Sequence, residues 1–206
     1  MATVDSQHNL IEIRDLSVTF PSEAGIVRAV RNVSLDIRAG EVLGIVGESG
    51  SGKTVMSLSM IGLVAESATI TGSITYNGVN LLDLNDNEMS KYRGKDIAMV
   101  FQDPLSALNP VHTIGRQIAE AIHIHSDVSK EAALARAVEL LEIVGIPRPG
   151  ERAQSYPHEF SGGMRQRVMI ALAIAKERPS PPVVATDASA RSHFGMAGYM
   201  ATVTSQ

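Results

Sequence analysis

Residues 47 to 54 carry the pattern with the clearest chemical meaning in this sequence. The segment Gly47-Glu48-Ser49-Gly50-Ser51-Gly52-Lys53-Thr54 matches G-x-x-x-x-G-K-[ST]. Glycines let the backbone turn successive N–H groups toward phosphate oxygens, and Lys53 adds a charge that reaches the β- and γ-phosphates. The Thr54 hydroxyl can ligate Mg²⁺. The pattern therefore predicts a loop that binds a nucleoside triphosphate together with Mg²⁺.

The residues on either side of this loop agree with that prediction. Val42–Val46 is a continuous apolar run, which predicts a strand buried on both faces of a parallel sheet. Val55–Val64 contains no proline and predicts a buried helix. Ile97–Phe101 predicts a second buried strand. We therefore expect an α/β core built from residues 41–64 and 95–102.

The remaining N-terminal residues predict an antiparallel β subdomain from residues 10–40 and 70–80. Apolar and polar residues alternate there, and the phase slips at Asp15, which is typical of a β-bulge. Asn77-Gly78 is a strong signal for a two-residue hairpin turn.

Helical spacing dominates from Ile114 onward, and residues 103–165 predict a helical subdomain. Ser129 can cap a helix in which Leu134, Val138 and Leu141 form one apolar stripe. Gly145 then ends that helix.

Composition excludes several classes of function. The net charge is −4, so no global positive field favours nucleic acid, and the absence of cysteine excludes thiolate metal sites. The longest apolar run, Val168–Ala175, is far shorter than the roughly 20 residues of a membrane helix, and residues 1–9 do not resemble a signal peptide. The histidines are interpreted as solvated or structural rather than as metal ligands: His112, His123, His125 and His158.

Two further segments add chemistry to the phosphate loop. Val100-Phe101-Gln102-Asp103-Pro104 places Gln102 at the end of a buried strand, where it could reach a metal or a water, although an ordinary strand-end glutamine has the same sequence appearance. Tyr156-Pro157-His158-Glu159-Phe160-Ser161-Gly162-Gly163-Met164-Arg165-Gln166-Arg167 begins a helix with a hydroxyl and bare N–H groups at Ser161, Gly162 and Gly163. That arrangement suits either a plain N-cap or an anion site.

Taken in order, the three segments resemble the Walker A, Q-loop and signature motifs of the ATP-binding cassette (ABC) family. The amino-acid sequences of these motifs are similar to those of the oligopeptide, dipeptide and nickel importers. The resemblance covers roughly residues 10 to 175. It implies a single ATP-binding domain over residues 10–206, with a P-loop NTPase core of the ABC type.

The resemblance also implies function and partners. The loop and Ser161–Gly163 would bind ATP between two ATPase subunits, with Mg²⁺ held by Thr54 and sensed by Gln102. Phe20 matches the aromatic residue that stacks on adenine, although a core phenylalanine is an equal reading. The partners would be a second ATPase subunit, two transmembrane permease subunits and a periplasmic or extracellular solute-binding protein. The subunit would be peripheral, on the cytoplasmic face of the bacterial inner membrane, and would couple ATP hydrolysis to peptide import.

Residues 176–206 depart from the family pattern. In the family, an apolar strand ends in Asp-Glu, and a switch histidine follows. Here the segment contains several prolines, and Asp187 is followed by Ala188 instead of by glutamate. We expected no core strand here, because proline removes a ladder hydrogen bond. We interpret this part as an atypical tail that follows a change of chain or reading frame near Lys176, so that the C-terminal part of the core is missing. The alternative function is a catalytically inactive, truncated remnant. A P-loop kinase or GTPase is disfavoured because Ser161-Gly162-Gly163 has no role in those enzymes.

Overall fold

A computed structural model describes residues 9–39, 41–101, 103, 107–175, 183–185 and 199–205. The chain forms two compact units. Unit 1 contains residues 1–97 and 182–206, and unit 2 contains residues 98–181.

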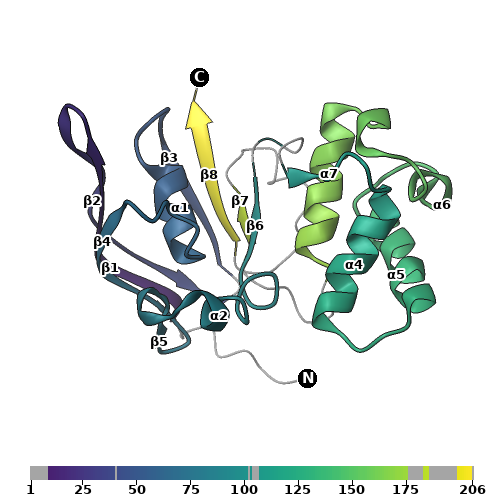
Figure 1. The fold of residues 1–206 in the computed structure, drawn as a ribbon, viewed down its shortest axis with the longest axis horizontal. Coiled ribbons are helices and arrows are strands. Elements are labelled where there is room, and N and C mark those ends of the chain that lie inside the picture. Colours follow the sequence, from purple (N-terminus) through teal and green to yellow (C-terminus); the bar gives the residue numbers. More distant parts are fainter. Residues whose placement is uncertain are drawn as a thin grey trace. The chain divides into compact units, whose positions relative to one another are not determined.

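The first sheet of unit 1 is antiparallel, with strand order β2-β1-β4-β5 (Figure 1). Its strands are β1 (Asn9–Ser22), β2 (Gly25–Arg38), β4 (Thr69–Tyr76) and β5 (Val79–Asn80). This sheet confirms the predicted antiparallel subdomain. The predicted turn is also present, since Asn77 and Gly78 both have positive φ between β4 and β5.

A bulge interrupts β1 where the sequence pattern slips. Asp15 has φ 49°, and the register of β1 against β2 shifts between Ile13 and Leu16. The shift keeps Ile11, Ile13, Leu16 and Val18 fully buried on one side of the sheet. A bulge thus preserves the apolar face across a change of phase.

The second sheet of unit 1 is parallel and contains β3 (Val42–Glu48), β8 (Tyr199–Ser205) and β7 (Val183–Ala185), in the order β3-β8-β7. β3 leads into α1 (Lys53–Met60). A 3-10 helix, η1 (Leu81–Asp83), and α2 (Asp86–Met89) complete the described part of this unit. The strand-turn-helix order around residues 47–54 is therefore as predicted.

Two predictions about this sheet were wrong. Strands β7 and β8 come from the segment in which we expected none, and they pair in parallel beside β3. The prolines lie before β7 in the sequence, so they do not remove hydrogen bonds from its ladder. β3 itself is not buried on both faces, because Val42 and Val46 are 58% and 70% exposed.

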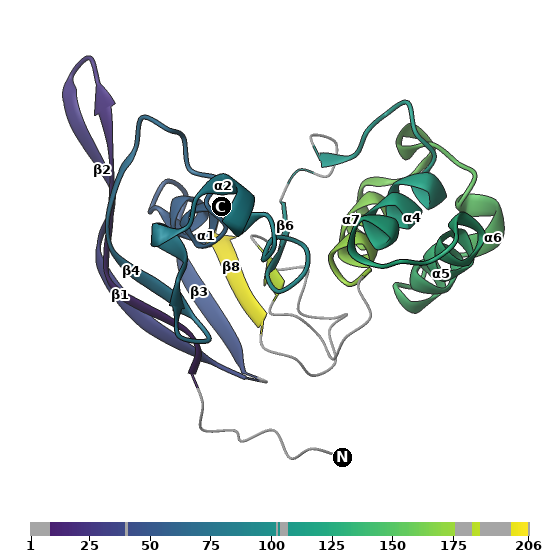
Figure 2. The ribbon, with the colours of Figure 1, turned by 60° about the horizontal axis from the view of Figure 1, so that its bottom comes forward.

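Unit 2 is mainly helical. It contains β6 (Ala98–Val100), α4 (Ile114–His125), α5 (Lys130–Ile143), α6 (Pro149–Arg152), η2 (Pro157–Glu159) and α7 (Gly162–Ala173). Figure 2 shows α4, α5 and α7 packed together. Ile114, Ile118, Leu141 and Val168 are among the buried side chains of these helices.

The apolar stripe of α5 differs from the prediction. Its buried residues are Ala133, Ala137, Leu140 and Leu141, whereas Leu134 is exposed. Alanine allows close approach of the neighbouring helices α4 and α7, so packing selects the face that carries the small residues.

Candidate phosphate-binding site

The phosphate loop connects the end of β3 to the start of α1. Gly52 is the N-cap of α1, and because it has no side chain, no cap hydrogen bond forms there. The first turn of α1 contains no acidic residue, and the first helical backbone bond runs from the N–H of Met56 to the carbonyl of Gly52. The N–H groups of the first turn are therefore left without a side-chain acceptor, which is the property of an anion site at a helix N-terminus.

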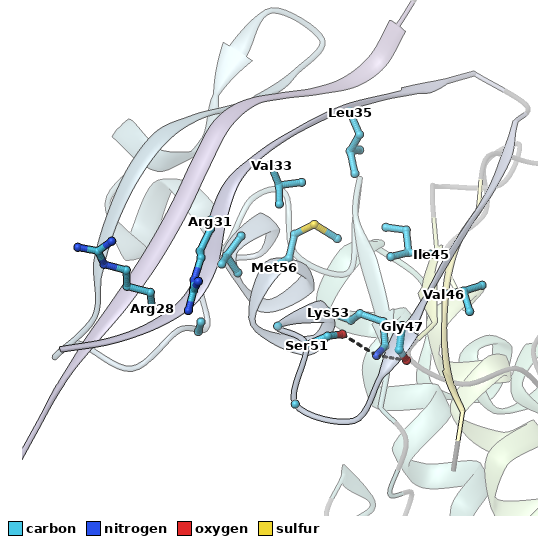
Figure 3. Close-up of a pocket in the computed structure, with 14 residues that line it drawn as sticks. Arg28, Arg31, Val33, Leu35, Ile45, Val46, Gly47, Ser51, Lys53 and Met56 are labelled. Atoms are coloured by element: carbon cyan, nitrogen blue, oxygen red, sulfur yellow. Dashed lines mark hydrogen bonds between the residues drawn. The ribbon is translucent and has the colours of Figure 1, made fainter. Parts of the chain in front are cut away.

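Lys53 lies folded against this loop and is only 9% exposed. Its Nζ donates to the carbonyl oxygens of Gly47 and Glu48, both at 2.7 Å, and to the Ser51 Oγ at 3.0 Å (Figure 3). These three acceptors are neutral groups, so none of them offsets a positive charge with a negative one. The side chain is thus positioned by the loop while its charge remains available to a phosphate.

Glycine is required at two points in the loop. Gly50 and Gly52 have φ values of 80° and 90°, which L-residues with a side chain rarely adopt. A Cβ at Gly52 would also overlap the carbonyl oxygen of Ala29 on β2. The loop therefore packs directly against β2.

A cavity of about 550 Å³ lies beside this contact. Its walls come from β2, β3, the phosphate loop and α1 (Figure 3). The lining residues are Arg28, Ala29, Val30, Arg31, Val33, Leu35, Ile45, Val46, Gly47, Gly50, Ser51, Gly52, Lys53 and Met56. All of the ionisable groups among them are cations. A site with loop N–H groups, three cations and apolar walls suits an anion that also carries an apolar part.

The remaining predicted residues of the loop and of β1 lie outside this lining. Glu48, Ser49 and Thr54 are exposed, and Thr54 is the second residue of α1. Phe20 is half-buried on β1, opposite Val27, and is absent from the described residues that line the cavity. Its proposed contact with a base gains no support from the cavity.

The other predicted residues belong to the chain beyond Ile97. Gln102 lies outside the described residues. Ser161 caps α7, since its Oγ accepts from the N–H of Met164 at 3.3 Å. Gly162 and Gly163, where bare N–H groups were expected, are the first two residues of this helix. Ser161, Gly162 and Gly163 are all exposed. The predicted N-cap is confirmed, and its role toward nucleotide stays a prediction.

Sequence reasoning missed Arg28 and Arg31. They lie on β2 and belong to no motif, and the contact of β2 with Gly52 becomes known only from the packing of the strand against the loop. In the described part of the chain, no group of three or more histidine or acidic side chains is placed to hold a metal ion. Nor does any described helix have the length and apolar character needed to cross a bilayer.

Comparison with known proteins identifies the family. Residues 30–183 match the family model described as ABC transporter. The chain therefore belongs to the ABC transporter family, as the three ordered motifs indicated, and its fold is that of the ATP-binding cassette.

Curated relatives of this chain are named as peptide transport proteins. The chain is 53% identical to the oligopeptide transport ATP-binding protein OppD of Mycobacterium tuberculosis, over 82% of this chain and 28% of that protein. It is 49% identical to the dipeptide transport ATP-binding protein DppD of Bacillus subtilis, over 82% of this chain and 51% of that protein. The chain thus spans about half, or less, of the length of these curated relatives.

Solved structures agree with this assignment. The ATP-binding cassette MJ0796, in a dimeric post-hydrolysis state bound to ADP and Pi, superposes with a TM-score of 0.78. That superposition covers 95% of this chain and 88% of the other, at 26% identity.

Proposed function

We propose that this chain is an ATP-binding subunit of a peptide importer and binds ATP at the loop formed by Gly47–Thr54. The observation that carries the proposal is the fully assembled phosphate loop. Lys53 is fixed by three loop oxygens, and the first turn of α1 has no side-chain cap. Such a loop binds phosphate through N–H groups and one cation.

Mg²⁺ fits the same site. The Thr54 hydroxyl is exposed at the start of α1, and hard oxygen ligands of this kind suit Mg²⁺. When bound, the ion would neutralise phosphate charge. Gln102 is proposed as a second ligand or sensor, from the family resemblance alone.

The proposed partners follow from the relatives. OppD and DppD are named as transport ATP-binding proteins, and the MJ0796 cassette is described as dimeric. We extend this to a second ATPase subunit that presents its own Ser161–Gly163, two permease subunits, and a solute-binding protein outside the membrane. The chain would then work on the cytoplasmic face of the bacterial inner membrane.

A second candidate is a chain that binds nucleotide without hydrolysing it. The family's Asp-Glu pair is not found in residues 176–206, where Asp187 is followed by Ala188 rather than by glutamate. Without that carboxylate, no residue is assigned to polarise the attacking water. Binding and turnover therefore have to be measured separately.

The binding experiment is calorimetric titration of ATP and Mg²⁺ into the purified protein. Lys53→Ala removes the cation that faces the phosphates and should abolish binding. Lys95→Ala removes an exposed lysine of the same unit that does not line the cavity, so it should leave the affinity unchanged. Equal affinity of the Lys53→Ala variant and the wild type would count decisively against the proposed site.

A further inference from the structure

The segment of β2 from Arg28 to Arg31 lies directly against the phosphate loop. The carbonyl oxygen of Ala29 occupies the space that a side chain on Gly52 would need. A Cγ2 atom of Val30 would lie 3.4 Å from that same side-chain position. Gly52 immediately precedes Lys53 in the loop. The two arginines that flank Ala29 and Val30 are therefore anchored next to the point where phosphate is proposed to bind.

Both arginines have free guanidinium groups within the part of the chain that the structure describes. Arg28 and Arg31 are exposed, and neither forms an ion pair or hydrogen bond with the described residues. Other arginines of the protein do pair with carboxylates, for example Arg93 with Asp86 at 2.7 Å. Both guanidinium groups are therefore free, among the described residues, to bind an anion.

The charge around the cavity is also unlike that of the chain as a whole. The net charge of the protein is −4, yet the ionisable groups that line the cavity are Arg28, Arg31 and Lys53. Figure 3 shows the arginines extending from β2, whereas Lys53 comes from the start of α1. The cavity therefore has cations on two separate walls. An anion with several charges would be attracted to both.

We propose that Arg28 and Arg31 contact the phosphate chain of the bound nucleotide from the β2 wall and so help to select polyphosphate ligands. The inference rests on the proposed function, since it concerns the same site. Guanidinium groups form paired hydrogen bonds with phosphate oxygens, which lysine cannot reproduce. Lys53 and the loop N–H groups bind the phosphates from one side, and the arginines add charge from the other.

The expected effect is moderate because both arginines are exposed. Solvent screens such contacts, and the loss of one should weaken binding about threefold to tenfold at low salt. The contribution should shrink as ionic strength rises, since the screening length is about 10 Å at 0.1 M salt. Removing both arginines should therefore weaken ATP binding by roughly tenfold or more at low salt, and by less at high salt.

The test is calorimetric titration of ATP and, separately, of inorganic triphosphate into four proteins: wild type, Arg28→Gln/Arg31→Gln, Arg38→Gln and Lys53→Ala. Arg38 is the matched control, because it is an exposed arginine on the same strand that does not line the cavity. The double variant should bind both ligands roughly tenfold more weakly than the wild type. Arg38→Gln should bind both ligands within about twofold of the wild type, as expected for loss of a distant, screened charge.

The outcomes distinguish failure of this inference from failure of the proposed function. A double variant that binds like Arg38→Gln overturns this inference and leaves the ATP site intact. A loss confined to ATP, with triphosphate binding unchanged, also overturns it, because the arginines would then contact the base or the ribose. Undiminished ATP binding by Lys53→Ala overturns the proposed function instead. No ATP binding by the wild type overturns both.

A charge-retaining variant excludes a folding artefact. Arg28→Lys/Arg31→Lys keeps two cations on β2 and should bind triphosphate more tightly than the glutamine double variant, though more weakly than the wild type. Equal losses in the lysine and glutamine variants would show that charge on β2 does not matter, and would overturn the inference.

Discussion

The carbonyl oxygen of Ala29 lies where Gly52 would carry a side chain. This contact joins the antiparallel sheet to the loop, because Ala29 belongs to β2 and Gly52 caps α1. The glycine thus serves two purposes at once. It permits φ 90°, and it lets the strand approach the loop backbone.

Gly52→Ala should therefore damage both stability and binding. The substitution combines backbone strain with an overlap against a main-chain atom, which cannot rotate away. We expect the free energy of unfolding to fall by about 3 kcal/mol or more. Denaturant unfolding and ATP titration would measure the two effects.

Gly50→Ala is the matched control for that substitution. Gly50 also has positive φ, at 80°, but a Cβ there would meet no atom within 4 Å. Only the backbone strain remains, so the loss should be about 1–2 kcal/mol. Equal losses at the two positions would show that the contact with Ala29 contributes nothing.

The N-cap of α5 gives a second prediction. Ser129 Oγ accepts from the N–H of Ala132 at 3.2 Å, so Ser129→Ala should cost about 1 kcal/mol. Thr113 at the start of α4 forms no side-chain cap bond, and Thr113→Ala should change stability much less. Thermal unfolding of both variants would test this. A larger loss at Thr113 would contradict it.

The same cap affects titration of Glu131. Its own backbone N–H and then the Ser129 hydroxyl donate to the carboxylate and hold the pKa of Glu131 below its ordinary value. A lowered carboxyl pKa means that the stabilising effect is present at neutral pH and disappears as the pH falls through that pKa. Ser129→Ala should raise the pKa of Glu131, which NMR titration of the side-chain carboxyl carbon would detect. An unchanged pKa would contradict the role of the hydroxyl.

Two glycines of unit 2 should respond to alanine with opposite signs. A Cβ on Gly115 would lie 2.8 Å from the carbonyl oxygen of Ala153 and 2.9 Å from its Cβ, so Gly115→Ala should destabilise unit 2 by about 1–3 kcal/mol. At Gly150 in α6 a Cβ would meet nothing within 4 Å, and Gly150→Ala should stabilise by about 0.5 kcal/mol. Amide exchange in α4 and α6 reports on the two sites. Faster exchange in both variants would show that space around the glycine does not decide the sign.

Steady ATP turnover should be absent from the isolated chain. Loss of a positioned general base commonly lowers a rate by about 10²–10⁴, and residues 176–206 contain no Asp-Glu pair like the one that supplies this glutamate in the family. Release of phosphate from ATP would be followed in the wild type and in Lys53→Ala. Turnover in the wild type that disappears in the variant would contradict this prediction.

Local features were predictable from the sequence. The phosphate loop, the Asn77-Gly78 turn and the caps at Ser129 and Ser161 depend on residues within a few positions of one another. Each has a specific backbone requirement, so the order of residues in a short segment is enough to identify it. The bulge at Asp15 was visible for the same reason, because it changes the phase of a two-residue pattern.

Features that depend on distant neighbours were not predictable. The buried face of α5 contains Ala133 and Ala137 instead of Leu134, because contacts with α4 and α7 decide which side is covered. Arg28 and Arg31 became candidates only once β2 was seen to contact Gly52. Their residue type suits phosphate, but nothing in the sequence places them near the loop.

The pairing of β3 with β8 has a consequence for the order of folding. Val42 pairs with Tyr199, so the strand that carries the phosphate loop joins a partner roughly 150 residues later in the chain. The β1–β2 hairpin closes over two residues and can form while the chain is still being synthesised. The parallel pair must wait until the ribosome has made the whole of unit 2. Until then, β3 presents an unpaired edge, a feature that favours aggregation of incomplete chains.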